Sequence, residues 1–397
     1  MNLRNIFPLL IALSLTTSLP ALEYSGYVGS ESRWFLESPA YPSQSNSLGF
    51  SASTELEFYH AWDDSDWEFE FTPFLRLDSE DDERSHLDVR ELYFLNSGRD
   101  WELKLGISKI FWGVTESQHL VDIINQTDLV ENIDGEDKLG QAMVQTTYIH
   151  DWGDFSFFLL PGFRERSFPG ADGRLRTPAP VDTDNPLWES SAEESHLDAA
   201  LRWKGIIGDF DIGAHYFKGT GRDPILIPQI GENGLESFTP FYEQIDQVGL
   251  DLQYTKEAWL WKLEAISRSG FNDSYEAAVG GFEYTFYGVM DSATDVGTLV
   301  EYHYDSRGGR ATSPFNRDIF AGTRITLNDE QDTNIIAGAF WDRSNDTTSV
   351  RVEFERRIGA NYQLEIEFQG FVEVPVGDPF FSFRRDSFVQ IDFRRYF

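Results

Sequence analysis

The stretch "SFVQIDFRRYF" (Ser387–Phe397) decides the fold class, because apolar and polar residues alternate along it. One parity carries Val389, Ile391, Phe393 and Phe397, and the other carries Gln390, Asp392 and Arg394. Successive side chains of a β-strand point to opposite faces, so the stretch predicts a strand with one apolar and one polar face.

The same alternation recurs along most of the chain, and helical spacing is almost absent. It is clearest in "SLGFSASTELEF" (47–58), "DWELKLGI" (100–107), "HLDAALRWK" (196–204), "SVRVEFER" (349–356) and "NYQLEIEFQ" (361–369). We expect about eighteen strands, with sixteen as the alternative, at 22–37, 47–61, 66–77, 86–96, 100–111, 141–150, 154–163, 196–206, 209–218, 239–255, 258–268, 275–287, 296–305, 316–327, 332–342, 347–356, 361–373 and 386–397.

A soluble β-sandwich also alternates, and the connections between strands separate the two cases. Every second connection is a tight turn, as in "DDSD", "NSGR", "DWG" and "RIGAN", and only the stretch around "GVMDSATD" (288–295) is longer. The intervening connections are longer, above all Trp112–Gly140 and Arg164–Ser195. Short turns at one end and long loops at the other are typical of transmembrane barrels with an even strand number. The sequence therefore predicts an all-β fold: a single antiparallel transmembrane β-barrel.

Composition excludes several classes of protein. With 67 acidic and 32 basic residues, the net charge of -35 argues against binding to nucleic acid, which needs a basic surface. A hydrophobic content of 41% and an aromatic content of 15% argue against a disordered acidic chain. The chain has no cysteine, so its stability does not depend on disulfides.

The first residues have the layout of a secretory signal peptide. Asn2 and Arg4 precede an apolar run from Ile6 to Leu15, and a small-residue region ends at Ala21. A membrane anchor would need about 20 apolar residues, and the run is shorter. We expect a signal peptide over residues 1–21 and a barrel over residues 22–397.

The closing strand resembles the C-terminal strand of Gram-negative outer-membrane barrels, which ends in a Phe read by the barrel-assembly machinery. Phe393 and Phe397 are the matching residues and the candidate assembly signal. The resemblance implies export through the periplasm to the outer membrane, with lipid and lipopolysaccharide around the barrel. Tryptophans near strand ends, such as Trp101, Trp259 and Trp341, fit girdles at the membrane interfaces.

A barrel of eighteen strands is wide enough for an aqueous lumen. The tract Trp112–Gly140 is too apolar in places for a solvated loop, and His119–Ile124 suggests one helical turn. We therefore expect this long loop to fold into the lumen and to narrow it. The candidate pore constriction combines acidic residues of the tract with basic residues of the wall: Glu116, Asp122, Asp128, Glu131, Arg90, Lys104, Arg202 and Arg351.

The tract also carries a family resemblance. "GISKIFWGVTES" (106–117) and "DIINQTD" (122–128) are similar to the segment after an early strand in porin-like outer-membrane barrels of proteobacteria. The matching residues are Gly106, Lys109, Trp112, Gly113, Glu116, Asn125 and Asp128. The resemblance covers some thirty residues and implies a porin-like barrel without naming a substrate.

The loop Arg164–Ser195 contains four arginines in an otherwise acidic protein: Arg164, Arg166, Arg174 and Arg176. Clustered arginines attract anionic solutes, which would make this loop an anion-attracting mouth. The alternative, which we favour, is that the arginines pair with acidic residues of neighbouring loops.

Motifs for catalysis and cofactors are missing from the sequence. The seven histidines show no His-Glu-x-x-His spacing, and no Gly-x-Ser-x-Gly elbow occurs. A serine–histidine–acid set assembled across strands stays open. We expect no enzyme, no metal site and no cofactor.

The function that the sequence favours is passive diffusion of small hydrophilic solutes or ions through a porin-like channel. The alternative is a non-conducting scaffold or surface-binding barrel that works through its loops. A polysaccharide export conduit is less favoured, because the inward parity leans acidic. An oligomer is compatible with the sequence, and no interface is legible in it.

Overall fold

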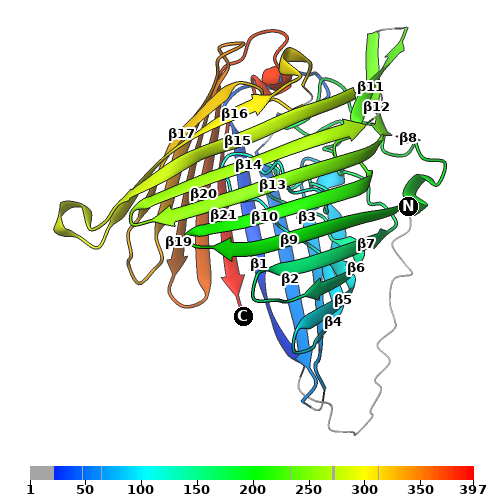
Figure 1. Cartoon of the computed structure of the whole chain (residues 1–397). Helices are drawn as coiled ribbons and strands as arrows, with labels where there is room; N and C mark the ends of the chain where they lie inside the picture. Colours follow the sequence, from blue (N-terminus) through cyan, green and yellow to red (C-terminus); the bar gives the residue numbers. More distant parts are fainter. Residues whose placement is uncertain (1–21, 47, 64, 233, 271–272, 312) are drawn as a thin grey trace, which may run out of the picture.

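Eighteen strands of the chain form one sheet that closes on itself (Figure 1). The computed structural model describes residues 22–397 apart from 47, 64, 233, 271–272 and 312, so the expected signal peptide lies outside the described residues. The barrel strands are β1 (Glu23–Phe35), β2 (Gly49–Ala61), β3 (Trp67–Asp78), β4 (His86–Ser97), β5 (Trp101–Ser108), β6 (Gln141–Tyr148), β7 (Asp154–Pro161), β9 (Leu197–Ile207), β10 (Phe210–Thr220), β13 (Gln244–Lys256), β14 (Trp259–Gly270), β15 (Asp273–Phe286), β16 (Asp295–Asp305), β17 (Asp318–Thr326), β18 (Asn334–Asp342), β19 (Thr348–Ile358), β20 (Tyr362–Glu373) and β21 (Phe388–Tyr396).

The remaining elements lie in the connections. A small three-stranded sheet is formed by β8 (Leu187–Trp188), β11 (Ile225–Gly231) and β12 (Gly234–Tyr242). The short 3-10 helices are η1 (Asp82–Arg84), η2 (Glu193–Ser195), η3 (Val289–Asp291), η4 (Gly308–Arg310) and η5 (Pro379–Phe383). Among the described residues, no helix is long and apolar enough to cross a membrane.

Pairing of the first and last strands closes the barrel. β1 is antiparallel to both β2 and β21, so that Ser30 lies opposite Ala52 on one side and Phe393 on the other. The backbone N–H of Phe397 donates to the carbonyl of Gly26 at 3.1 Å. A closed sheet has no edge strand with unpaired backbone groups, which the interior of a membrane requires. The expected eighteen strands are confirmed, and the sixteen-strand alternative is wrong.

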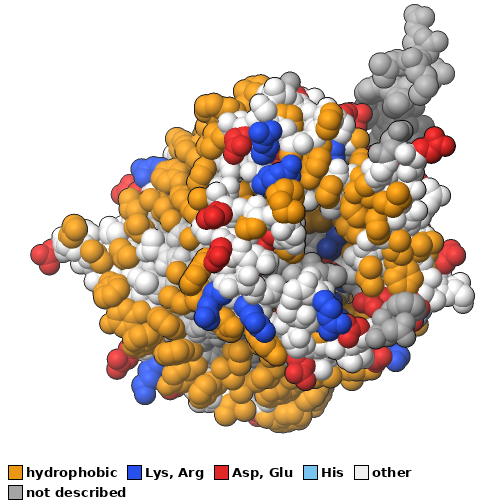
Figure 2. All heavy atoms as spheres, turned by 90° about the horizontal axis from the view of Figure 1, so that it is seen from above, with side chains coloured by type: hydrophobic (Ala, Val, Ile, Leu, Met, Phe, Trp, Pro, Cys, Tyr) orange, Lys and Arg blue, Asp and Glu red, His pale blue; other side chains and the backbone are white. Residues whose placement is uncertain are grey.

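Most connections alternate between short and long, as the sequence predicts. The exceptions flank β15: only positions 271–272 separate it from β14 at one end, and residues 287–294 join it to β16 at the other. We call the two ends of the barrel the turn end and the loop end, and Figure 2 looks onto the loop end. One expected strand, 239–255, is in fact two elements, since Thr239–Tyr242 belongs to β12 and the barrel strand β13 begins at Gln244. The strands β8 and β11 and the first half of β12 are not expected from the sequence, because they lie in connections that the sequence leaves as loops, 164–195 and 219–237.

The barrel wall exposes its apolar side chains and buries its polar ones, which is the reverse of the pattern in a soluble protein. On β13, Val248 and Leu250 are 57% and 38% exposed, whereas Gln247 and Asp251 are 1% and 5% exposed. On β21, Ile391 is 47% exposed and Asp392 is 3% exposed. Apolar side chains cover much of the outer wall in Figure 2. A sandwich would bury its apolar face between two layers, so this pattern fits a barrel with a polar interior.

Tryptophan side chains mark both ends of the outer wall. Five tryptophans that are more than a third exposed lie in or near the turn end, namely Trp62, Trp101, Trp152, Trp259 and Trp261. Trp341 is 48% exposed at the loop end of β18. Tryptophans at both borders of the apolar wall fit the interfacial girdles of a membrane barrel.

A matched pair of substitutions on β13 tests which face meets lipid. Leu250 lies at the centre of the strand on the apolar face, and Gln253 lies on the inward parity. Leu250→Arg should lower the free energy of unfolding by about 2–4 kcal/mol, since arginine is costly at the middle of a bilayer, while Gln253→Arg should cost far less. Urea unfolding of the protein in phospholipid vesicles measures both, and a larger cost for Gln253→Arg would contradict the orientation.

Candidate functional site in the barrel lumen

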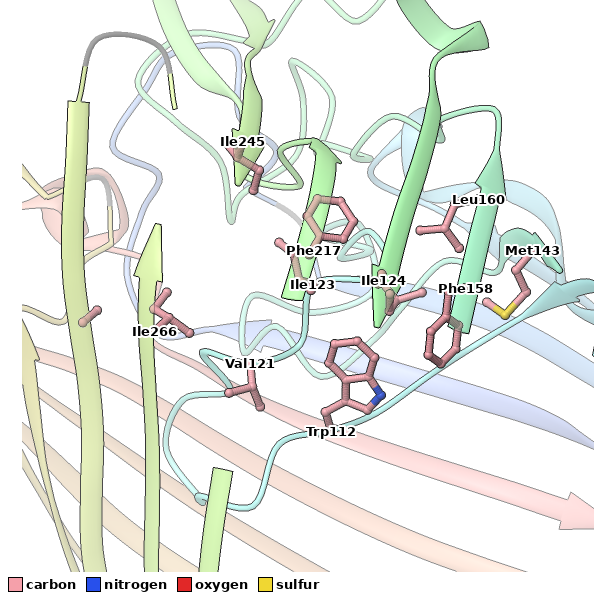
Figure 3. Close-up of a cluster of buried hydrophobic side chains, with 12 residues drawn as sticks. Trp112, Val121, Ile123, Ile124, Met143, Phe158, Leu160, Phe217, Ile245 and Ile266 are labelled. Atoms are coloured by element: carbon pink, nitrogen blue, oxygen red, sulfur yellow. The ribbon is translucent and has the colours of Figure 1, made fainter. Parts of the chain in front are cut away.

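The tract Trp112–Gly140, here called the inward segment, packs inside the barrel (Figure 3). Its apolar side chains Trp112, Val121, Ile123 and Ile124 are at most 7% exposed. They form one cluster with inward-facing residues of seven strands: Met143, Phe158, Leu160, Ala200, Phe217, Ile245, Ile266 and Ala277. The inward segment thus packs against apolar residues on the inner wall from β6 to β15, and this contact removes apolar surface from water.

Two buried carboxylates of the wall hold the backbone of the inward segment. Glu264 on β14 is fully buried and accepts hydrogen bonds from the backbone N–H groups of Val114 and Thr115, at 2.7 and 3.0 Å. Glu301 on β16 accepts from the N–H groups of Glu116 and Ser117, each at 2.9 Å. A carboxylate buried without partners is very costly, so these contacts fix where the segment lies.

A histidine of the segment adds to this anchor. The ring nitrogen Nδ1 of His119 lies 3.8 Å from a carboxylate oxygen of Glu264. Burial alone would lower the pKa of His119, but the nearby carboxylates of Glu264 and Asp122 favour the protonated ring and raise the pKa overall. A protonated His119 would strengthen the contact between the segment and β14.

On the opposite wall, arginines hold the acidic part of the segment. Asp128, which is fully buried, pairs with Arg90 of β4 at 2.7 Å. The carboxylate of Glu131 accepts hydrogen bonds from two guanidinium nitrogens of Arg76 on β3, at 2.6 and 2.9 Å. Arg76 also bonds Glu31 of β1 at 2.8 Å. Each of these buried charges has a partner, which avoids the much larger cost of a lone buried charge, so loss of one arginine would destabilise the position of the segment.

The tip of the inward segment, residues 132–134, contacts a third part of the wall. Arg351 of β19 donates to the carboxylate of Asp134 at 2.7 Å. The side chain of Asn132 donates to Glu367 of β20 at 3.2 Å. The segment is therefore tied to β3 and β4, to β14 and β16, and to β19 and β20. The expected helical turn at His119–Ile124 is wrong, because the chain makes only a turn at Leu120 and Val121, where side-chain anchors replace helical hydrogen bonds.

Two cavities lie on either side of the inward segment. The turn-end cavity measures about 1070 Å³ and reaches Ala360 and Asn361 in the turn between β19 and β20. The loop-end cavity measures about 720 Å³ and reaches Phe168 and Pro314 in the long connections. Both cavities are lined by one set of residues, here called the junction: Asn132, Asp134, Glu136, Lys138, Ile336, Arg351, Glu353 and Glu367. The tip of the segment and the wall of β18–β20 meet at the junction.

The structure distributes the eight candidate constriction residues over several sites. Arg351 lines both cavities, Glu116 and Asp122 line the loop-end cavity, and Arg90 and Glu131 line the turn-end cavity. Glu116 pairs with Arg324 at 2.7 Å and with Lys262 at 3.6 Å. Asp122 instead braces the segment itself by accepting from the backbone of Trp112 at 2.6 Å.

The other three candidate residues line neither cavity. Asp128 is taken up by its pair with Arg90. Lys104 lies over the ring of Tyr93 at 4.2 Å. Arg202 pairs with Asp251 at 2.8 Å and lies over the ring of Trp112 at 4.8 Å. These residues support the lumen wall and the inward segment.

Sequence reasoning missed the anchoring role of Glu264 and Glu301 and the place of Glu367 at the junction. Alternation places all three on the inward parity. It cannot reveal that Glu264 meets a backbone 149 residues away in the chain.

The four arginines of the loop 164–195 are largely neutralised. Three of them pair with Asp88, Asp223 and Asp386, the latter two at 2.6 and 2.8 Å: Arg164, Arg166 and Arg174. Arg176 donates to backbone carbonyls, including that of Thr177 at 2.8 Å. Burial raises the pKa of Asp386 to about 6, and the positive charge of the neighbouring Arg174 offsets only part of this increase. Pairing with acidic residues of loops is confirmed for Arg166 and Arg174, whereas Arg164 pairs with Asp88 on the strand β4, and a free anion-attracting mouth is not supported.

One group of side chains has the spacing of a metal site. Ligand atoms of His86, Asp128 and Glu131 lie within 4.8 Å of one another. Arg90 and Arg76 already pair with the two carboxylates at 2.7 and 2.6 Å. A divalent cation would have to displace two guanidinium groups, so the arrangement fits an ion-pair network better than a metal site.

A serine and a histidine also meet across the lumen. Ser117 Oγ lies 2.8 Å from Nε2 of His303, and it also bonds Glu301. In a catalytic triad the acid would hold the other ring nitrogen of the histidine. Here that nitrogen lies 3.4 Å from the backbone carbonyl of Asp318, and His303 is fully buried. The contact fits another anchor of the inward segment.

Comparison with known proteins places the fold. No protein-family model matches the sequence, and no curated protein sequence matches it. The chain is similar to the structure of Wzi from Escherichia coli, an outer membrane protein involved in group 1 capsule assembly and described as a carbohydrate-binding β-barrel. The TM-score is 0.55 and the identity 11%, over 93% of this chain and 84% of Wzi.

Other solved structures are similar at lower TM-scores. They include OmpT, an outer membrane protein of Vibrio cholerae, with a TM-score of 0.47, 11% identity and coverage of 95% of this chain and 99% of OmpT. A mutant porin of Rhodopseudomonas blastica matches with a TM-score of 0.46, 10% identity and coverage of 95% and 100%. The chain is a closed, antiparallel barrel of eighteen strands with the fold of outer-membrane proteins, consistent with a porin-like barrel.

Proposed function

We propose that the protein is an outer-membrane channel for passive diffusion of small hydrophilic solutes or ions. The observation that carries this proposal is the junction, where a cavity reaching the turn end and a cavity reaching the loop end share their lining. The turn-end cavity and the junction are lined mostly by charged side chains, which are stable next to water and costly in a dry core. The inward segment narrows the path between them.

The same proposal accounts for the surroundings of the barrel. The apolar outer wall would lie in outer-membrane lipid, with the turn end in the periplasm and the loop end near lipopolysaccharide. The solutes would be small and polar, because the path passes between the tip of the inward segment and the wall of β18–β20. The barrel would act without catalysis and without a cofactor.

Conductance in planar bilayers tests the channel directly. The folded protein should give stepwise ion currents. Deletion of residues 117–135 should raise the conductance at least about twofold, because the lumen of an eighteen-stranded barrel is wide without its inward segment. Migration on unheated gels controls for folding of the deletion variant. A folded wild-type protein without any current would contradict the channel.

A single substitution tests whether the tip is held at the junction. Arg351→Gln removes the cation that donates to Asp134 at 2.7 Å, so the tip should move more freely and current fluctuations in the open state should grow. Arg357→Gln is the control, because Arg357 is exposed near the turn end and lines neither cavity. Single-channel noise analysis compares the two variants. Equal noise would show that the contact between Arg351 and Asp134 does not restrict the motion of the tip.

A non-conducting barrel that binds a ligand at its loop end is the second candidate function. One observation favours it: several phenylalanines line the loop-end cavity, namely Phe315, Phe320, Phe340, Phe371, Phe380 and Phe383. Aromatic rings in a lumen offer flat contact surfaces, and the similar barrel Wzi is described as carbohydrate-binding. This function predicts a sealed lumen without ion current, so the conductance measurement separates the two candidates.

A further inference from the structure

We propose that the junction and the turn-end cavity make this channel selective for cations. The inference rests on the proposed channel function and adds the charge of the preferred solute. It follows from the balance of charged side chains along the path, and from the way in which one arginine is shared at the narrowing.

The turn-end cavity is strongly acidic. Twelve carboxylates line it: Glu31, Glu55, Glu57, Glu131, Asp134, Glu136, Asp137, Glu353, Glu355, Glu365, Glu367 and Asp392. Seven cationic side chains stand against them: Arg76, Arg90, Lys109, Lys138, Arg324, Arg351 and Arg394. A water-filled cavity inside a wall of low dielectric focuses such an excess, so cations are concentrated in it and anions are repelled.

The excess persists at the narrowing. Among the junction residues, Asp134, Glu136, Glu353 and Glu367 are acidic, and only Lys138 and Arg351 are basic. Ions that pass here come within a few ångströms of these groups, a distance shorter than the Debye length of about 8 Å at physiological salt. Screening by salt therefore does not remove the effect.

A single guanidinium serves three of these carboxylates. Arg351 bonds Asp134 at 2.7 Å, lies 3.4 Å from Glu367 and also pairs with Glu353. One positive charge cannot neutralise three negative charges. Lys138, the other basic residue of the junction, is buried and donates to Thr127 at 3.1 Å, so four carboxylates stand against two cations there. Glu136, by contrast, is exposed to both cavities.

The loop-end cavity does not oppose this preference. Eight carboxylates and seven arginine or lysine side chains line it, so its charge is close to balanced. Most of its arginines are paired with carboxylates, as Arg166 is with Asp223 at 2.6 Å and Arg222 with Asp198 at 2.7 Å, and Arg176 donates to backbone carbonyls. The loop-end cavity therefore does not favour anions, and the charge selectivity is set at the junction and in the turn-end cavity.

The reversal potential under a tenfold KCl gradient tests the inference. In bilayers of uncharged phosphatidylcholine at pH 8, the wild-type channel should favour potassium over chloride by about threefold or more, as expected for a net acidic lining. Glu353→Gln combined with Glu367→Gln should lower this permeability ratio at least about twofold, because two of the four junction carboxylates become neutral. Arg351→Gln should raise the ratio.

The control carries the same change in net charge away from the lumen. Asp209→Asn combined with Glu257→Gln neutralises two exposed carboxylates in tight turns at the turn end, neither of which lines a cavity. Its permeability ratio should equal that of the wild type. A conducting wild-type channel with a ratio near or below one would overturn the inference and leave the channel function intact. A folded protein without current would overturn the channel function, and the inference with it.

If the double variant at the junction fails to fold, the wild-type ratio and the Arg351→Gln ratio still decide the question. Removal of the positive charge of Arg351 leaves the junction more negative, so the potassium-to-chloride permeability ratio should rise. A lower ratio in Arg351→Gln would contradict an acidic selectivity filter.

Discussion

Closure of the sheet is the constraint on which the rest of the structure depends. Backbone groups in the hydrocarbon region find no water, so each strand needs a partner on both sides. β1 meets this requirement by pairing with β2 and β21, which leaves no free edge. Once the sheet is closed, every strand has one face toward lipid and one toward an enclosed space. The alternation of Leu250 and Asp251 on β13 is the direct consequence of that geometry.

Enclosure also decides how charges are placed. The interior is too crowded to solvate every side chain, and buried charges are paired or hydrogen-bonded instead. Glu264 and Glu301 meet backbone N–H groups of the inward segment, and Arg76 and Arg90 meet its carboxylates. A segment without regular secondary structure is thus held by polar contacts on two sides and by an apolar cluster on a third. Side chains that line the two cavities have water as an alternative partner, and there the acidic excess can act on passing ions.

The strands could be predicted from the sequence because each one separates two different surroundings. Lipid and lumen impose a period of two, and tight turns alternate with long loops, so all eighteen barrel strands were expected near their observed positions. The boundary between β12 and β13 is missed, because only Glu243 separates Thr239–Tyr242 from Gln244–Lys256 and no turn motif marks the change to the small sheet. Partners across the lumen could not be predicted. Asp134 and Arg351 are 217 residues apart, and only the curvature of the closed sheet brings them together.

Cysteine scanning of one strand tests the orientation of the wall most directly, because the chain contains no cysteine that would react in the background. Single cysteines at positions 248 to 253 of β13 can carry a nitroxide label in phospholipid vesicles. The relaxation of the label is then measured with a water-soluble nickel complex and with oxygen, which partitions into lipid. The account predicts strict alternation, with oxygen dominant at 248, 250 and 252 and the nickel complex dominant at 249, 251 and 253. The opposite phase, or no alternation at all, would contradict an apolar wall that faces lipid around a polar lumen.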